Sequence, residues 1–288
     1  MAISRSNYTQ RYGVDLAVFT LDSDTTYYQY VTDATLGVSL PTTSGRAAKD
    51  LDILIAAGAS SATIDASNII TDAYCPMLTI ALSATPYFTA ILRPAATSDS
   101  YTNATANTTG KFLLTSCKTS VSEGAITESW SAVMQGALAS TTPTTATVGR
   151  RSDLASTQFG VDVGSLEIGT GNDFLAHYDS FDIDVSIGTA VESAVMDTWQ
   201  WPVQTERKIV LNASRIVDSP VTTPAASLYW TNIAIARTIV AVSIEFGGGT
   251  FSGNMICTDA KWSLGGANGA QKETITLENY GAMTFPGS

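Results

Sequence analysis

Short runs in which apolar and polar residues alternate recur along the chain. The strictest run is 181–187, Phe-Asp-Ile-Asp-Val-Ser-Ile, and residues 274–278 alternate in the same way. A period of two is typical of β-strands that bury one face. Residues 208–213 are more continuously apolar, which favours a strand buried on both faces. Thr and Val are frequent, and their β-branched side chains suit a pleated sheet.

One short segment in each half of the chain fits either a helix or a buried strand. The two segments are 77–84 and 231–237, and the second precedes a strand expected at 239–246. Periodicity does not separate helix from strand in apolar runs this short. The Gly-rich stretch 265–269 lies between two strand-like runs and predicts a hairpin loop. The predicted fold class is mainly β, with a small sandwich or barrel in each half and room for one short helix beside it.

The second half of the chain repeats the first. Three segments return at one ungapped offset of 147 residues (159 − 12): 12–16 as 159–163, 36–40 as 183–187, and 65–70 as 212–217. After a shift of frame, 110–115 parallels 253–258, and 130–138 parallels 274–283. A repeat over nearly the whole chain predicts two tandem copies of one module. We place the copies at 8–138 and 156–288, joined by an extended Thr-rich linker at 139–155.

The two predicted modules differ in two places. The first carries a long polar loop, Ala95 to Gly110, where the second has only Gly247 to Gly253. The second carries Trp199 and Trp201, which have no aromatic counterpart near Ile53. These segments are candidates for contacts that the two modules make differently.

The charge balance restricts the possible partners. The 288 residues carry a net charge of −11 with only 15 Lys and Arg, scattered along the chain, and charged residues make up 14%. Tight nucleic-acid binding requires a cluster of basic residues, so it is not expected. With 44% hydrophobic residues the chain is not disordered either. A surface poor in charge suits a protein that packs against copies of itself.

The cysteines and the N-terminus indicate a protein that folds inside the cell. Cys75, Cys117 and Cys257 are odd in number, lie in or beside apolar runs and show no CxxC spacing, so they are expected to be buried free thiols. Residues 1–10 are polar and lack the apolar core of a signal peptide. No stretch approaches the length of a membrane span, and no membrane partner is expected.

The candidate chemical groups favour structural roles. His177 is the single histidine, and its repeat position is Tyr30, which indicates packing instead of catalysis. Asp179, Asp182 and Asp184 could attract calcium, but two of them would share the solvent face of one strand. The glycines at 169–171 and 247–249 continue into no P-loop or dinucleotide fingerprint and predict turns. We therefore expect no enzymatic activity, no cofactor, and no catalytic, cofactor-binding or metal-binding residues.

The chain resembles the tail tube proteins of long-tailed bacteriophages, in tandem-duplicated form. The resemblance lies in a strand pair that includes 212–217, in the aromatic-x-Gly entry to a late strand at 250–255, and in the closing stretch 273–283, which ends on Gly281 and Met283. The Thr-rich linker departs from single-module members of that family.

The resemblance implies a structural virion protein. Family modules join their sheets around a ring, usually six modules to a ring, and the rings stack into a tube that conducts DNA. A chain with two modules would then form homotrimeric rings with pseudo-sixfold symmetry. It would fold in the host cytoplasm, reside in the phage tail, contact other tail proteins and let DNA pass without binding it tightly. The loop Ala95 to Gly110 is either a stacking contact between rings or a mobile surface loop.

Two other functions remain open from the sequence. The first is a capsid decoration protein, or another virion β protein that stays a discrete oligomer. The second is a carbohydrate-binding surface module, for which Trp199 and Trp201 would supply stacking surfaces if they are exposed.

Overall fold

The structure is a computed structural model, and the description that follows covers the well-placed parts of the chain. These are residues 17–21, 25–27, 30–45, 54–70, 75–92, 100–102, 111–122, 125–137, 139–141, 165–168, 178–192, 197–217, 230–246, 249–263 and 271–285. Of their strands, fifteen belong to one antiparallel sheet and two to a separate ribbon. The mainly β fold predicted from the alternation is confirmed.

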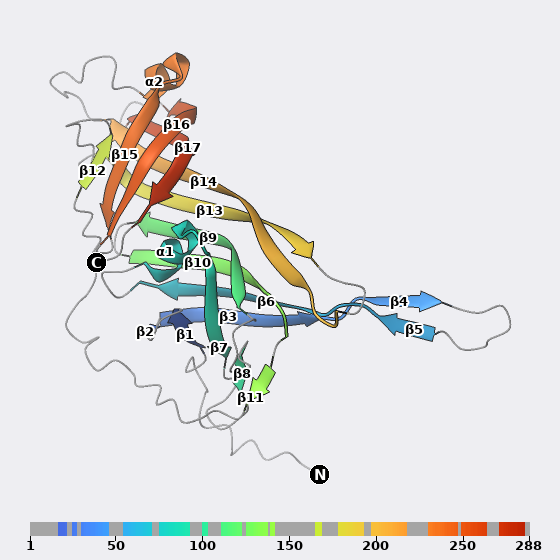
Figure 1. The fold of residues 1–288 in the computed structure, drawn as a ribbon. Helices are drawn as coiled ribbons and strands as arrows, with labels where there is room; N and C mark the ends of the chain where they lie inside the picture. The colour runs from blue at the N-terminus through green and yellow to red at the C-terminus, as the bar shows by residue number, and fades with distance from the viewer. Residues whose placement is uncertain are drawn as a thin grey trace, which may run out of the picture.

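A continuous run of eight antiparallel strands forms the spine of the molecule (Figure 1). Its first four strands come from the first half of the chain and its last four from the second. The order across the sheet is β3 (Tyr30–Ser39), β6 (Ser61–Ile69), β10 (Ala125–Met134), β9 (Phe112–Ser122), β13 (Tyr178–Glu192), β14 (Trp201–Val217), β17 (Gln271–Thr284) and β16 (Gly249–Ser263). The sheets of the two halves are therefore joined through β9 and β13 into one sheet.

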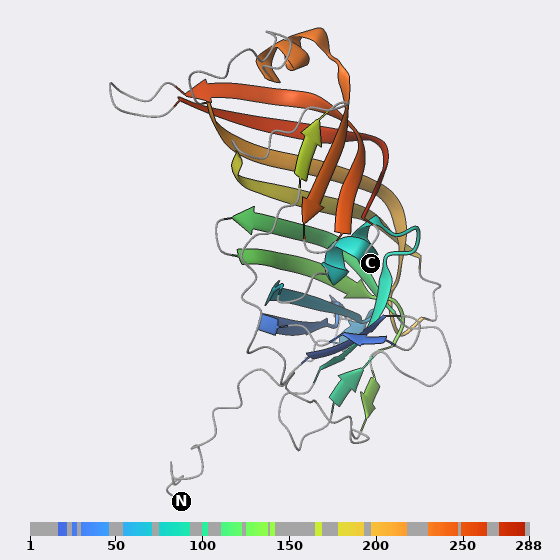
Figure 2. The same ribbon diagram turned by 90° about the vertical axis from the view of Figure 1, so that its left-hand side faces the viewer.

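Shorter strands fold over one face of this spine and enclose the core (Figure 2). In the first half they are β1 (Ala17–Leu21), β2 (Thr25–Tyr27), β7 (Tyr87–Leu92), β8 (Ser100–Thr102) and β11 (Ala139–Thr141); in the second they are β12 (Ser165–Ile168) and β15 (Ile239–Phe246). Phe88 of β7 stacks edge-on against Trp130 of β10, with ring centroids 5.4 Å apart. Phe246 of β15 meets Phe181 of β13 at 5.4 Å in the same way. Aromatic rings thus join the two layers in both halves.

Two helices of seven residues each settle the choice between helix and strand. They are α1 (Pro76–Leu82) and α2 (Trp230–Ala236), close to the two segments identified in the sequence. Pro76 begins α1, where its missing N–H and its restricted φ are tolerated. Met77 and Leu78 are buried, and the helix contacts β9, β10, β13 and β17. Helix α1 therefore lies over the junction between the halves, whereas α2 contacts β16.

A two-stranded ribbon extends from the end of the spine sheet (Figure 1). It consists of β4 (Thr42–Gly45) and β5 (Leu54–Ala57), with Thr42 opposite Ala57. Residues 42–45 are exposed throughout, and the ribbon belongs to no larger sheet among the described strands. An isolated pair of strands is marginally stable in water, so this ribbon is a candidate contact surface.

Several predictions at the level of single strands can now be compared with the structure. Phe181, Ile183, Val185 and Ile187 are all buried, as their alternation predicted. The prediction that 208–213 is buried on both faces is wrong, because Lys208 is exposed while Ile209 and Leu211 are buried. In the described residues no second layer covers that face of the sheet. Residues 139–141 of the predicted linker form β11, and 142–155 lie outside the described residues.

Candidate assembly surfaces

The uncovered face of the spine sheet is lined by polar side chains. On β3, β6, β10, β9 and β13 the residues that alternate with the core residues are mostly Asp, Ser, Thr and Lys. They surround a hollow of about 290 Å³, whose lining includes Asp33, Asp65, Lys118, Ser129, Ser131 and Asp184. Strands from both halves line this hollow, so the polar face runs across the junction without a break.

Most of the charged groups on this face are paired. Lys118 reaches Asp182 across the junction at 3.2 Å, Lys208 reaches Glu278 at 2.9 Å, and Lys261 reaches Asp259 at 2.5 Å. Paired lysines offer little positive charge to a phosphate, and the surface remains hydrated. The expectation that Asp182 and Asp184 share the solvent side of one strand is confirmed by the register of β13.

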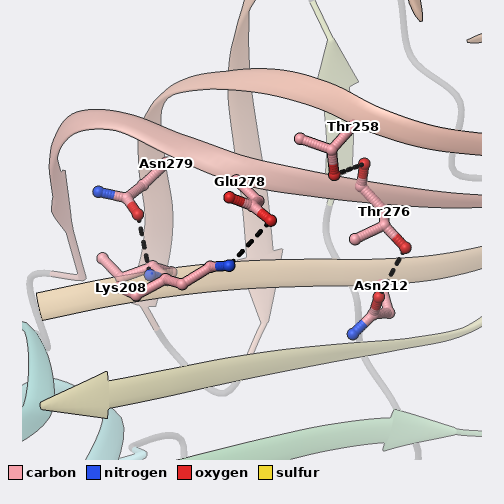
Figure 3. A network of polar contacts seen from close by, with 7 residues as sticks. Lys208, Asn212, Thr258, Thr276, Glu278 and Asn279 are labelled. Carbon is pink, nitrogen blue, oxygen red and sulfur yellow. Dashed lines mark hydrogen bonds and ion pairs between the residues drawn. The ribbon is translucent and has the colours of Figure 1, made fainter.

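Hydrogen bonds made by side chains continue this polar surface across β14, β17 and β16 (Figure 3). Thr276 donates its hydroxyl hydrogen to Asn212 at 2.9 Å, and Asn212 donates to Asp184 at 3.1 Å. Partial burial raises the pKa of Asp184. The side-chain oxygen of Asn279 accepts the backbone N–H of Ile209 at 2.9 Å. These bonds hold the polar side chains in place on a surface that faces water. None of these bonds joins a nucleophile to a base.

The internal junction is a regular antiparallel pairing of β9 with β13. Val185 lies opposite Cys117, and Ile183 lies opposite Thr119. All four side chains are buried. Helix α1 covers the apolar side of this pairing and contacts both strands. The junction therefore has the properties of a folded core, although its two strands come from different halves of the chain.

The two outer strands of the spine present edges that no described strand covers. Strand β3 pairs only with β6, and residues 257–263 of β16 pair only with β17. Apolar side chains are exposed at both edges: Val38 (58% exposed) lies on β3, Leu40 (53%) directly follows it, and Trp262 (41%) lies on β16. Uncovered strand edges with apolar side chains readily pair with another chain.

Each half also buries one glutamate, which sequence reasoning missed. Glu128 on β10 accepts the backbone N–H groups of Leu78 at 3.0 Å and Met77 at 3.3 Å, and it thereby caps the start of α1. Asn68 and Thr119 donate to the same carboxylate at 3.4 and 3.5 Å. Burial raises the pKa of Glu128 to about 7, against the opposing effect of these hydrogen bonds.

Glu273 on β17 is enclosed by different partners. Arg215 donates to it from Nε at 2.7 Å and forms an ion pair with it, and Trp262 donates its indole N–H at 3.0 Å. The signal for both glutamates lies in the alternation, because each falls on the apolar positions of its strand, as Glu128 does between Ile126 and Trp130. Both sites anchor the fold.

The remaining sequence candidates divide between described and undescribed residues. His177 and the glycines at 169–171 lie outside the described residues. Of the loop Ala95 to Gly110, residues 100–102 form β8 and the rest lies outside the described residues. Gly249 stands opposite Phe246 at the end of the antiparallel pairing of β15 with β16, and 247–248 lie outside the described residues.

The described side chains include no group of three or more His, Cys, Asp or Glu residues that could hold a metal ion. Cys75, Cys117 and Cys257 are buried free thiols, as predicted, and burial raises the pKa of each. Neither helix in the described ranges has the length and apolar character needed to cross a membrane.

Trp199 and Trp201 are half-buried and therefore offer less stacking surface than the carbohydrate hypothesis needs. They line an open hollow of about 700 Å³ together with Glu192 and Asp197. The backbone around Trp199 bonds to Ser60 of the first half, with Gln200 N–H donating to Ser60 O at 2.8 Å. The segment therefore serves as a contact between the halves.

Comparisons with known proteins establish no family for the chain. No protein-family model matches it, and no curated protein matches it. Among solved structures, a chain from the virion of a native gene transfer agent (GTA) particle is similar, with 13% identity and a TM-score of 0.35. The match covers 43% of this chain and 96% of that one. A similarity at this level carries no weight for the function of this chain.

Proposed function

We propose that this chain is a structural virion protein, the tube protein of a phage tail, whose copies join edge to edge into rings. The observation that carries the proposal is the continuous sheet through β9 and β13. One strand from each half already meets in the way that neighbouring subunits of a ring would meet. Uncovered edges at β3 and β16 allow the same sheet to continue into further copies.

The polarity of the edges supports a closed ring. Strand β3 belongs to the first half and β16 to the second, so a contact between them is head-to-tail. Head-to-tail contacts close into a ring when the rotation per subunit allows it, and otherwise extend into a filament. With two modules per chain and six modules per ring, the ring contains three chains and has pseudo-sixfold symmetry.

The polar face of the sheet suits the wall of a channel. Lys118, Lys208 and Lys261 on this face are paired with Asp182, Glu278 and Asp259, and the chain as a whole carries a net charge of −11. Lysines paired in this way attract phosphates weakly, so a wall of this kind lets DNA pass. In this proposal the polar face lines the lumen and the layer that contains α1 and β7 lies outside.

Electron microscopy of the concentrated protein, with native mass spectrometry on the same sample, tests the proposal. Stacked rings or hollow tubes with a closed unit of three chains are expected. Discrete oligomers that never stack would favour a capsid decoration protein. A monomer at all concentrations that binds a glycan array, and loses that binding in Trp199→Ala, would favour the carbohydrate module.

A further inference from the structure

We infer that the contact between copies repeats the junction inside the chain, residue for residue. Strand β3 of one copy pairs antiparallel with residues 257–263 of the next copy, and the β4–β5 ribbon of the first lies against the irregular part of β17 at Tyr280 and Gly281 of the second. This inference rests on the proposed edge-to-edge assembly and specifies its partner, its strands and its register.

The two halves have the same spatial order of strands. In the first half the spine strands lie in the order β3–β6–β10–β9, and in the second half they lie in the order β13–β14–β17–β16. In both halves the last of the four strands along the chain lies between the second and the third. The registers agree as well. Leu36 lies opposite Ile64 and Ile183 lies opposite Leu211, and both residues of the first pair are 147 positions before those of the second.

A shared bulge aligns β9 with β16. Thr115 is the one residue of β9 skipped in the pairing with β10, and Thr258 is skipped in the pairing of β16 with β17. Each donates its hydroxyl hydrogen to a backbone carbonyl of the partner strand, Thr115 to Ser131 at 3.0 Å and Thr258 to Thr276 at 3.3 Å. Cys117 lies two residues after Thr115 and therefore matches Ala260, which lies two residues after Thr258. In the same way Thr119 matches Trp262.

These two alignments determine the register between copies. Inside the chain Val185 lies opposite Cys117, so Val38 of one copy lies opposite Ala260 of the next. In the same way the pair of Ile183 and Thr119 becomes the pair of Leu36 and Trp262.

The exposed residues of the free chain support this register. Val185 is 1% exposed at the internal junction, whereas Val38 at the matching position is 58% exposed. Leu40 and Trp262 are exposed at the same two edges. An apolar side chain gains stability by leaving water, and the proposed pairing covers all three. Helix α2 contacts β16, as α1 contacts β9, and its Ile235 is also exposed.

The ribbon β4–β5 has its own counterpart inside the chain. Thr42 lies opposite Ala57, and at the offset of 147 Thr189 lies opposite Gln204, near the turn end of the β13–β14 hairpin. That hairpin docks on the first half, where Gln135 Nε2 donates to Pro202 O at 3.1 Å and Gly136 N–H donates to Gln200 O at 3.1 Å.

The docking surface is repeated in the second half. Gly136 lies two residues after the end of β10 and Gly281 lies near the end of β17, and the two glycines share a left-handed backbone, with φ of 85° and 95°. By this match Ile55 of the ribbon meets Tyr280 of the next copy. Both side chains are exposed in the free chain, by 69% and 58%.

Thiol cross-linking of the full chain tests the register. In the variant Val38→Cys with Ala260→Cys, a short bismaleimide cross-linker should join neighbouring copies and produce dimers and trimers on a denaturing gel, with nothing larger. Mixing the two single variants, Val38→Cys and Ala260→Cys, should produce dimers only. Ser116→Cys with Ser186→Cys is the positive control, because these residues lie opposite each other on the polar face of the internal junction, and it should cross-link within one chain.

Register controls use the other face of the same strands. Val38→Cys with Lys261→Cys places the thiols on opposite faces and should not cross-link. Cross-linking of Val38→Cys alone would mean symmetric pairing of two β3 edges and would overturn the inference. Rings seen by electron microscopy without a Val38–Ala260 cross-link would also overturn it, while leaving the proposed function intact. No assembly of the wild-type chain at any concentration would overturn the proposed function itself.

Discussion

The junction inside the chain and the open edges at its two ends present matching strands in different surroundings. At the junction Val185 is buried against Cys117 and covered by α1. At the edge Val38 occupies the matching position on β3 and is exposed. The comparison teaches that a buried strand pairing and an open apolar edge are built from matching residues, which is the observation behind the proposed pairing between copies.

The buried glutamates provide a second comparison between the halves. Glu128 is held by neutral donors, including the first N–H groups of α1, whereas Glu273 is held by the charged Arg215. Asn68 and Arg215 occupy matching positions 147 residues apart. One anchoring position has thus been satisfied in two ways, with different consequences for stability and for its dependence on pH.

The largest effect is expected from a charge placed in the internal junction. Val185→Asp buries a carboxylate between strands with no cation beside it, and should lower the free energy of unfolding by about 4 kcal/mol. Urea unfolding followed by circular dichroism, at a concentration where the chain is monomeric, measures the change.

Val38→Asp is the matched change at the open edge. It should alter the free energy of unfolding by less than about 0.5 kcal/mol, because the side chain is exposed. It should abolish rings in electron microscopy and native mass spectra. Equal losses of monomer stability in the two variants would contradict the distinction between junction and edge.

The next largest effect concerns the charged pair of the second half. Glu273→Gln leaves the buried Arg215 without its counter-ion and should cost about 3–5 kcal/mol in chemical denaturation. Replacing both residues by leucine should cost less than Glu273→Gln alone, since no charge then remains buried. If replacing both residues lowers the free energy of unfolding by as much as the separate replacements of Glu273 and Arg215 do together, the ion pair is not the cause of the loss.

A pH effect is expected from Glu128. Burial raises its pKa from 4.5 to about 7, so the folded chain holds this proton more tightly than the unfolded chain. Its contribution is complete below pH 4.5 and is lost as the pH rises through 7. The wild type should lose about 3 kcal/mol over this range relative to Glu128→Gln. Unfolding free energies measured for both proteins from pH 4.5 to 8 test this, and parallel profiles would refute it.

The smallest effect is expected from the ion pair that crosses the internal junction. Lys118 and Asp182 are 47% and 37% exposed, so Lys118→Ala should cost less than about 1 kcal/mol and lose its effect in high salt. Lys208→Ala, which removes the pair with Glu278 within the second half, should behave alike. A loss above about 2 kcal/mol for Lys118 alone would mean that surface charge, and not apolar burial, holds the junction together.

The sequence predicted local structure well where one face of a strand is buried. Residues 181–187 form the central part of β13 with the predicted faces, and both short helices lie in the segments identified. The prediction failed at 208–213, because Val210 is adjacent to buried residues in sequence but lies on the polar side of the sheet. The buried glutamates were missed because a carboxylate at a core-facing position of a strand is stable only when other residues donate hydrogen bonds to it. Those partners are distant in the chain, so the local pattern does not reveal them.

By itself, the sequence determined that the fold is mainly β, which residues of 181–187 and 274–278 face the core, and which positions recur 147 residues apart. These properties follow from the period of two and from local composition. Only the tertiary structure decided that β9 pairs with β13, that Glu128 caps α1, and that the β13–β14 hairpin rests on Ser60 and Gly136. The physical reason is that alternation specifies the face of a strand but not its neighbour, which is chosen by contacts between residues far apart in the chain.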